Sequence, residues 1–125
     1  MNEINRPDVL EEVNAVFDAY ERALTSNDVA MLDDLFFDSS LTVRYGATEN
    51  LYGYDAIREF RAARSGTGLA REVTARMVTT YGESMAVANI EFRREGDARI
   101  GRQSQTWIRL EDGWKVVSAH VSWMT

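Results

Sequence analysis

Arg44 is the residue best suited to binding a small ligand. It lies on a short predicted strand, residues 41–45, and Gly46 follows that strand. Glu49 follows three residues after that glycine. A guanidinium offers paired N–H donors that match the two oxygens of a carboxylate. Arg44 therefore predicts a site for a small carboxylate, and a salt bridge to an acid such as Glu49 is the alternative.

Tyr20 and His120 are candidates for proton transfer. Tyr20 lies on the apolar face of a predicted helix, so its hydroxyl should point inward, toward a backbone carbonyl or toward a substrate. His120 is the only histidine, and strict alternation along the last predicted strand puts it on one face with Trp114 and Val116. It is either a structural histidine at the sheet surface or a group that binds substrate or transfers a proton.

A second group of candidates lies around the predicted helix 54–64. Arg61 and Arg64 are three residues apart and share a face of that helix. They are either solvated surface charges or a second contact for a substrate with two carboxylates. Asn50, on a very short predicted strand, is a further predicted substrate-binding residue.

Several kinds of chemistry have no support in the sequence. It contains no phosphate-binding glycine loop, nucleophile elbow or dinucleotide fingerprint, so we expect no cofactor. One histidine and no cysteine make a zinc site improbable. No aspartate lies within an apolar strand pattern, which weakens the case for an isomerase or cyclase with a buried carboxylate base.

Composition narrows the class of protein. The chain has 125 residues, 45% of them hydrophobic, and a net charge of −6, which argues against a nucleic-acid-binding protein. No apolar run approaches the roughly 20 residues of a membrane span. The N-terminal residues do not resemble a signal peptide, so a cytoplasmic location is expected.

Hydrophobic periodicity predicts a single α+β domain over residues 1–125. A helix begins at Pro7 and ends before Ser26, and a shorter helix starts near Asp28. Glycine-containing turns then separate four predicted strands, which indicates consecutive hairpins. The strands that follow the helix 54–64 are predicted at residues 71–81, 84–94, 99–110 and 114–124.

The element order resembles the nuclear-transport-factor-2-like (NTF2-like, SnoaL-like) superfamily, in which helices pack on a curved, mostly antiparallel sheet to form a cone with a pocket. Particular segments are similar to the AtzH-like group, which includes the HpxZ proteins of oxalurate catabolism. These segments are Arg44–Gly46, Glu49–Gly53, Ile57–Arg64, Gly101–Trp107 and Gly113–Ser122.

The resemblance implies action on small carboxylated ureas in nitrogen catabolism. The associated activity is that of a decarboxylating amidohydrolase, for example the conversion of dicarboxyurea to allophanate. It further implies that Tyr20 and Arg44 are the catalytic pair. His120, Arg64 and Asn50 are the predicted substrate-binding residues.

Two other functions remain open. The chain could bind a small carboxylate without turnover, as an accessory protein of a partner amidase, or it could be an isomerase-like or cyclase-like enzyme of the same fold.

Because a four-strand sheet has two faces and only one can line the cone, we also expect a homodimer.

Overall fold

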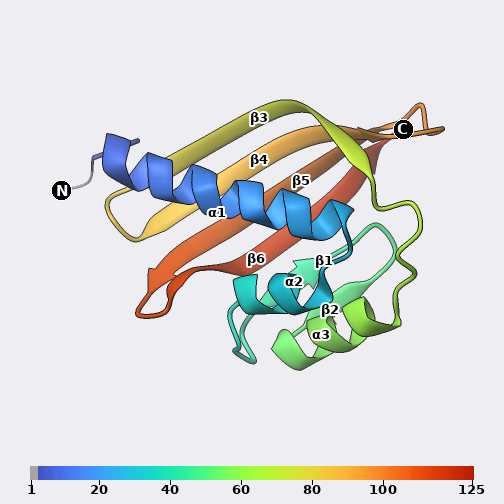
Figure 1. Cartoon of the computed structure of the whole chain (residues 1–125), viewed down its shortest axis with the longest axis horizontal. Helices are drawn as coiled ribbons and strands as arrows, with labels where there is room; N and C mark the ends of the chain where they lie inside the picture. The colour runs from blue at the N-terminus through green and yellow to red at the C-terminus, as the bar shows by residue number, and fades with distance from the viewer. Residues whose placement is uncertain (1–2) are drawn as a thin grey trace.

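The computed structural model describes residues 3–125, and it confirms the predicted α+β order of elements (Figure 1). No helix in the described part of the chain is long and apolar enough to cross a membrane. The elements are α1 (Pro7–Thr25), α2 (Val29–Leu35), β1 (Val43–Tyr45), β2 (Asn50–Tyr52), α3 (Tyr54–Ala63), β3 (Arg71–Tyr81), β4 (Met85–Arg94), β5 (Ile100–Leu110) and β6 (Gly113–Met124).

The strands form one sheet in the order β2-β1-β6-β5-β4-β3. Only the β1–β6 pair among these neighbours is parallel, and the others are antiparallel. Helix α1 lies across one face of the long strands, while α2 and α3 lie near β1 and β2 (Figure 1). The face that α1 covers is called the inner face below.

Helix α1 forms where the sequence predicts it and buries one apolar side. Pro7 occupies its first turn, where the missing backbone N–H leaves no hydrogen bond unmade. Val9, Val13, Phe17 and Tyr20 are buried at helical spacing against the inner face of the sheet. This packing places the predicted catalytic tyrosine inside the molecule.

Two ion pairs attach α1 to the edge strand β3. Arg71 pairs with Glu21 and lies 4.4 Å over the ring of Phe92, and Arg76 pairs with Asp18 at 2.6 Å. The Arg71 side chain is buried, so its contact with Glu21 is little weakened by solvent. These contacts hold the helix against the sheet at a fixed position.

A β-bulge in β6 changes which residues face inward. Val117 is an extra residue opposite β5, next to the pairing of Trp107 with Val116. As a result, Val116 and Ala119 are both buried on the inner face, while His120 is exposed. Strict alternation would have placed His120 on the same face as Val116, and that expectation is wrong.

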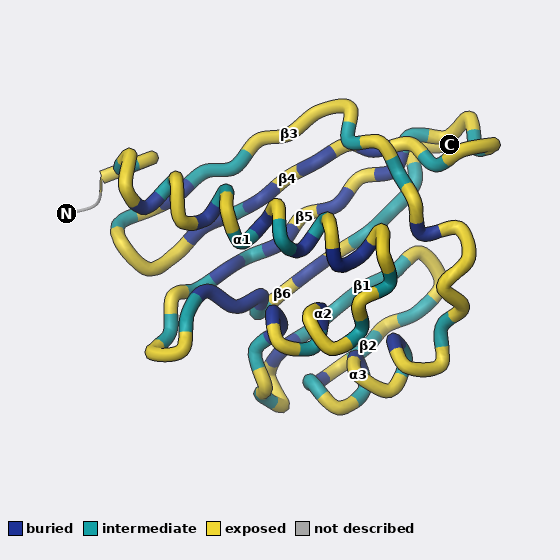
Figure 2. The backbone as a smooth tube through the Cα atoms, in the orientation of Figure 1, coloured by how far each residue is buried: buried dark blue, intermediate teal, exposed yellow. Residues whose placement is uncertain are grey.

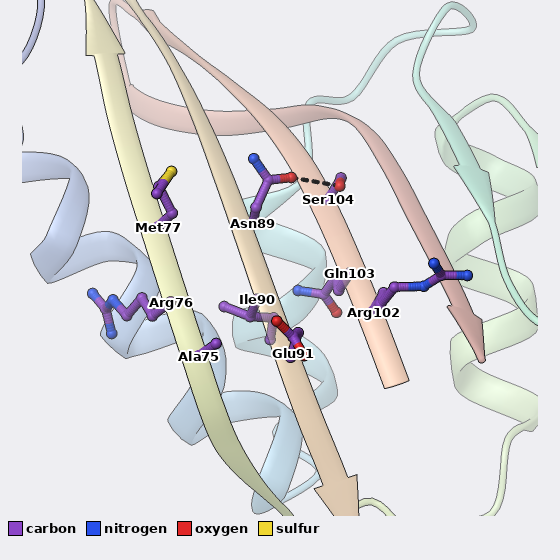
Figure 3. Close-up of a pocket in the computed structure, with 9 residues that line it drawn as sticks. All are labelled: Ala75, Arg76, Met77, Asn89, Ile90, Glu91, Arg102, Gln103 and Ser104. Carbon is purple, nitrogen blue, oxygen red and sulfur yellow. Dashed lines mark hydrogen bonds between the residues drawn. The ribbon is translucent and has the colours of Figure 1, made fainter. Parts of the chain in front are cut away.

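The outer face of the sheet carries a shallow hollow of about 340 Å³ formed by β3, β4 and β5 (Figure 3). Strands β4 and β5 alternate between buried and more exposed residues (Figure 2), and Met77 of β3, on this outer face, is 68% exposed. Asn89 lies opposite Met77 on the next strand, and it shares a hydrogen bond with Ser104 of β5. Glu91 lies directly opposite Arg102 on the neighbouring strand, so the face carries both signs of charge.

The homodimer remains a prediction, and we propose that two copies of this outer face meet. A surface with both signs of charge can pair with itself, and exposed apolar side chains favour burial. Met77→Asp should then shift the protein from dimer to monomer in gel filtration at micromolar concentration. The same substitution at Met31, which is exposed on α2, serves as the control. A monomeric parent protein would contradict the proposal.

Gly101 is predicted to be essential for core packing. A Cβ atom at this position would lie 2.3 Å from the ring of Phe92, which is fully buried. We expect Gly101→Ala to lower the free energy of unfolding by about 1–3 kcal/mol, the usual cost of overpacking a core. In a Phe92→Leu background the same change should cost less, because the ring is absent. Urea unfolding of the four proteins measures this coupling, and equal costs in both backgrounds would refute the explanation.

Candidate functional site

A polar cavity of about 370 Å³ lies where the β1–β2 hairpin, the end of α3 and the ends of β4 and β6 meet. Three arginines line it, one from each of β1, the end of α3 and β4. The side chains used below are those of Arg44, Thr48, Glu49, Phe60, Arg64, Arg94 and Trp123. Because this cavity gathers three cations and one anion, it is the candidate site.

Arg44 lies on the inner face of β1, opposite Ala119 of β6. Its Nη1 donates to Glu49 Oε1 at 3.0 Å, and its guanidinium lies 5.6 Å from the ring centre of Phe60. The predicted salt bridge is therefore confirmed, and Arg44 also lines the cavity as the carboxylate hypothesis requires. Arg44 can therefore pair with Glu49 and still line a cavity that could hold a carboxylate.

Arg64 follows the last turn of α3 and turns its guanidinium into the cavity. Its Nε and Nη2 atoms are buried and have no hydrogen-bond partner within residues 3–125. Burial, followed by the positive charge of Arg44, lowers the pKa of Arg64. A buried, unpartnered guanidinium is costly, so this side chain is suited to binding an anion.

Arg61 does not accompany Arg64 into this site. It is buried, donates to Asp33 at 2.7 Å and lies 4.6 Å over the ring of Phe36. The expectation that Arg61 is a solvated surface charge is wrong, because α3 packs against α2 at this point. Arg61 instead joins the two helices.

Arg94 is the functional candidate that the sequence reasoning missed. Its Nε is buried and has no hydrogen-bond partner in the described part of the chain, and its guanidinium lies 5.3 Å from the ring centre of Trp123. Burial, followed by the charge of Arg71, lowers the pKa of Arg94. The signal was available: buried residues alternate along β4 through Ile90 and Phe92, and the next residue in that series is Arg94.

Tyr20 lies in the core and is not among the residues that line the cavity. It is 5% exposed, and its ring contacts those of Phe17, Phe36 and Trp107 at centroid distances of 6.2–6.5 Å. A negative charge on its phenol would act on the Arg64 guanidinium, so the two groups lie within electrostatic range of each other.

His120 and Asn50 lie on the outer face of the sheet. Each is opposite Tyr45 in the strand ladder, and the His120 and Tyr45 rings meet edge to face at 5.6 Å. Arg44, the neighbour of Tyr45, points to the other face. The structure therefore does not bring His120 or Asn50 to the cavity that Arg44 and Arg64 line.

Two buried glutamines add polar groups to the inner face of β5. Gln105 Oε1 accepts from Trp107 Nε1 at 3.1 Å, and Gln103 Oε1 accepts from Arg71 at 3.2 Å. The Nε2 group of each amide is buried without a partner among the described residues. Residues 3–125 contain no cluster of three or more acidic or histidine side chains placed to hold a metal ion.

Comparison with solved structures identifies the class as the NTF2-like fold. A family model described as AtzH-like matches residues 2–125, so the chain belongs to the AtzH-like family. No curated protein matches the sequence.

Three solved structures illustrate the relationship. A protein of unknown function from Pectobacterium atrosepticum is 55% identical, with a TM-score of 0.96 over 98% of this chain and 95% of its own. A cystatin-like fold protein from Burkholderia xenovorans is 41% identical, with a TM-score of 0.96 over 100% and 98%. An NTF2-like superfamily protein from Salmonella enterica, 23% identical, has a TM-score of 0.77 over 94% and 92%, and shares the fold.

If Arg64 is retained for ligand binding, replacing it should stabilise the free protein. Arg64→Met keeps much of the apolar stem and removes two buried nitrogen groups that have no partner in the described structure. We expect the free energy of unfolding to rise by about 1–2 kcal/mol, within the cost of burying unpaired polar groups. Arg58→Met, at an exposed position of the same helix, makes the same charge change and should have little effect. Urea unfolding tests both, and a less stable Arg64→Met protein would contradict the expectation.

Proposed function

We propose that this protein is a cytoplasmic decarboxylating amidohydrolase of nitrogen catabolism that acts on small carboxylated ureas, such as dicarboxyurea. The observation that carries the proposal is the cavity lined by Arg44, Arg64 and Arg94, in which N–H groups of the last two are buried and have no partner among the residues that the structure describes. Such donors favour a small anion with planar carboxylates. Membership of the AtzH-like family supports the same substrate class.

In this proposal Arg44 and Arg64 orient the carboxylates of the substrate from opposite sides of the cavity. Arg44 comes from β1 and Arg64 from the end of α3, and each repels the other, so an anion between them relieves that repulsion. Arg94 adds a third positive charge beside Trp123. Restricted access of water would strengthen each of these interactions.

The chemical step releases the carboxyl group that is bound to a urea nitrogen. The N–C bond to that carboxyl breaks, its electron pair stays on the nitrogen, the nitrogen takes up one proton, and carbon dioxide leaves. Tyr20 is proposed to supply the proton and to recover one from water. Arg64, the guanidinium in electrostatic range of the phenol, would stabilise the negative charge left on it.

A second candidate function is carboxylate binding without turnover, as an accessory protein for a partner amidase. The observation that favours it is the placement of Tyr20 in the core, outside the residues that line the cavity. Without a proton donor at the ligand, the arginines could still bind and present a carboxylate. Recovery of a large amidohydrolase with the purified protein would support this alternative.

An isomerase-like or cyclase-like function has less support. Enolisation needs a carboxylate base that is free to take a proton. Among residues 3–125, Glu49 is the only acidic residue that lines the cavity, and both of its oxygens are already bound, one to Arg44 and one to Thr48. The cavity is therefore better suited to an anion than to an uncharged ketone.

Substitution of the proposed catalytic pair tests the enzymatic function. Tyr20→Phe should lower kcat by roughly 10²–10⁴-fold, the usual contribution of a positioned proton donor. Arg44→Ala should lower kcat/KM by loss of a carboxylate contact. The measurement is carbon dioxide release from dicarboxyurea.

Matched controls lie on the outer face: Tyr45→Phe for the tyrosine and Arg102→Ala for the arginine. Both controls should retain activity. Full activity in folded Tyr20→Phe and Arg44→Ala proteins would refute the proposed roles. An inactive parent protein that still binds the substrate would favour the accessory function instead.

A further inference from the structure

Glu49 is bound in the cavity much as a ligand carboxylate would be. Its Oε1 accepts from Arg44 Nη1 at 3.0 Å. Its Oε2 accepts from the backbone N–H of Thr48 at 3.2 Å and from the Thr48 hydroxyl. Burial acts to raise the pKa of Glu49, but the hydrogen bonds from Thr48 and the Arg44 guanidinium together outweigh it and hold that pKa below its usual value. The carboxylate is therefore ionised at neutral pH.

Gly46 makes this placement of Glu49 sterically feasible. A Cβ atom at Gly46 would lie 1.8 Å from Glu49 Oε1 and 3.1 Å from Arg44 Nη1. The Gly46 N–H also donates to the Glu49 carbonyl at 2.9 Å and closes the turn between β1 and β2. The turn thus returns the chain's own carboxylate to Arg44, through space that any other residue would fill.

Of the three arginines that line the cavity, Glu49 pairs with Arg44, which lies only five residues before it in the sequence. Arg64 and Arg94 belong to the same cavity but have buried N–H groups without a partner within residues 3–125. Glu49 covers Arg44 alone, from a turn whose residues Ala47 and Thr48 are exposed.

We propose that Arg44 and Thr48 form a carboxylate-binding site that Glu49 occupies in the free protein and that a ligand carboxylate takes over by displacing it. This inference rests on the proposed function only in taking the ligand to be a carboxylate. The exchange replaces one set of charge-assisted hydrogen bonds with an equivalent set. Glu49 can turn outward by rotation of its side chain, because it belongs to an exposed turn.

An internal occupant lowers the apparent affinity for any competing carboxylate. The apparent Kd equals the intrinsic Kd divided by the fraction of molecules whose site is open. If the site is open about one-tenth of the time, removing the occupant should tighten binding roughly tenfold. Glu49 would then select ligands that bind the other arginines as well, since a single carboxylate gains little from the exchange.

Malonate, a small dicarboxylate, is the probe, and isothermal titration calorimetry measures its Kd. Glu49→Gln removes the competing charge and should bind malonate several-fold to roughly tenfold more tightly than the parent protein. Gly46→Ala should show no such gain, because its Cβ would lie 1.8 Å from the position of Glu49 Oε1 and would fill the space that a ligand oxygen needs. Glu83→Gln is the matched control, because this exposed residue pairs with Arg6 and its change alters the net charge equally. Its Kd should stay that of the parent protein.

Addition of Arg44→Ala to the Glu49→Gln protein should abolish the gain, which would locate the exchange at Arg44. Unchanged or weaker binding by Glu49→Gln would overturn the inference and make Glu49 a structural partner of Arg44. The proposed function would survive that result if malonate binds the parent protein and is lost in Arg64→Ala. An absence of binding by both the parent and Glu49→Gln would overturn the inference together with the anion site.

Discussion

Repulsion between guanidinium groups enclosed in one cavity is the constraint on which the candidate site depends. Arg44, Arg64 and Arg94 share a space of about 370 Å³, and within residues 3–125 the only carboxylate that lines it is that of Glu49. Burial lowers the pKa values of Arg64 and Arg94, and the charge of Arg44 adds to this at Arg64, as the charge of Arg71 does at Arg94. An anion that enters the cavity should therefore stabilise the protein, because it supplies the missing counter-charge.

Other arginines join the helices to the elements beside them. Arg71 and Arg76 fasten α1 to β3, and Arg61 fastens α3 to α2 through Asp33. Each of these arginines also lies over an aromatic ring. The protein thus uses one residue type for two tasks: paired arginines join the elements, and the arginines of the cavity are left partly unpaired for a ligand.

The placement of Tyr20 separates the two leading functions more clearly than the arginines do. An anion site serves an enzyme and a binding protein equally well, whereas a proton donor serves only the enzyme. Because the ring of Tyr20 packs among core aromatics, its hydroxyl is positioned by α1 and not by the cavity lining. Any catalytic contact of this phenol with substrate therefore depends on how deeply the substrate enters the cavity.

The sequence by itself determined the order of elements and the α+β class, because helical and strand periodicity are local properties. It offered the Arg44–Glu49 pair only as an alternative, and the structure shows that this pair forms. Alternation along β4 indicates that Arg94 faces inward, but only the tertiary structure decided that it meets Arg44 and Arg64 in one cavity and that His120 faces outward. Arg94 enters through the pairing of strands distant in sequence, and His120 is turned outward by a bulge at Val117. Packing sets both, and no local pattern of residues specifies a bulge.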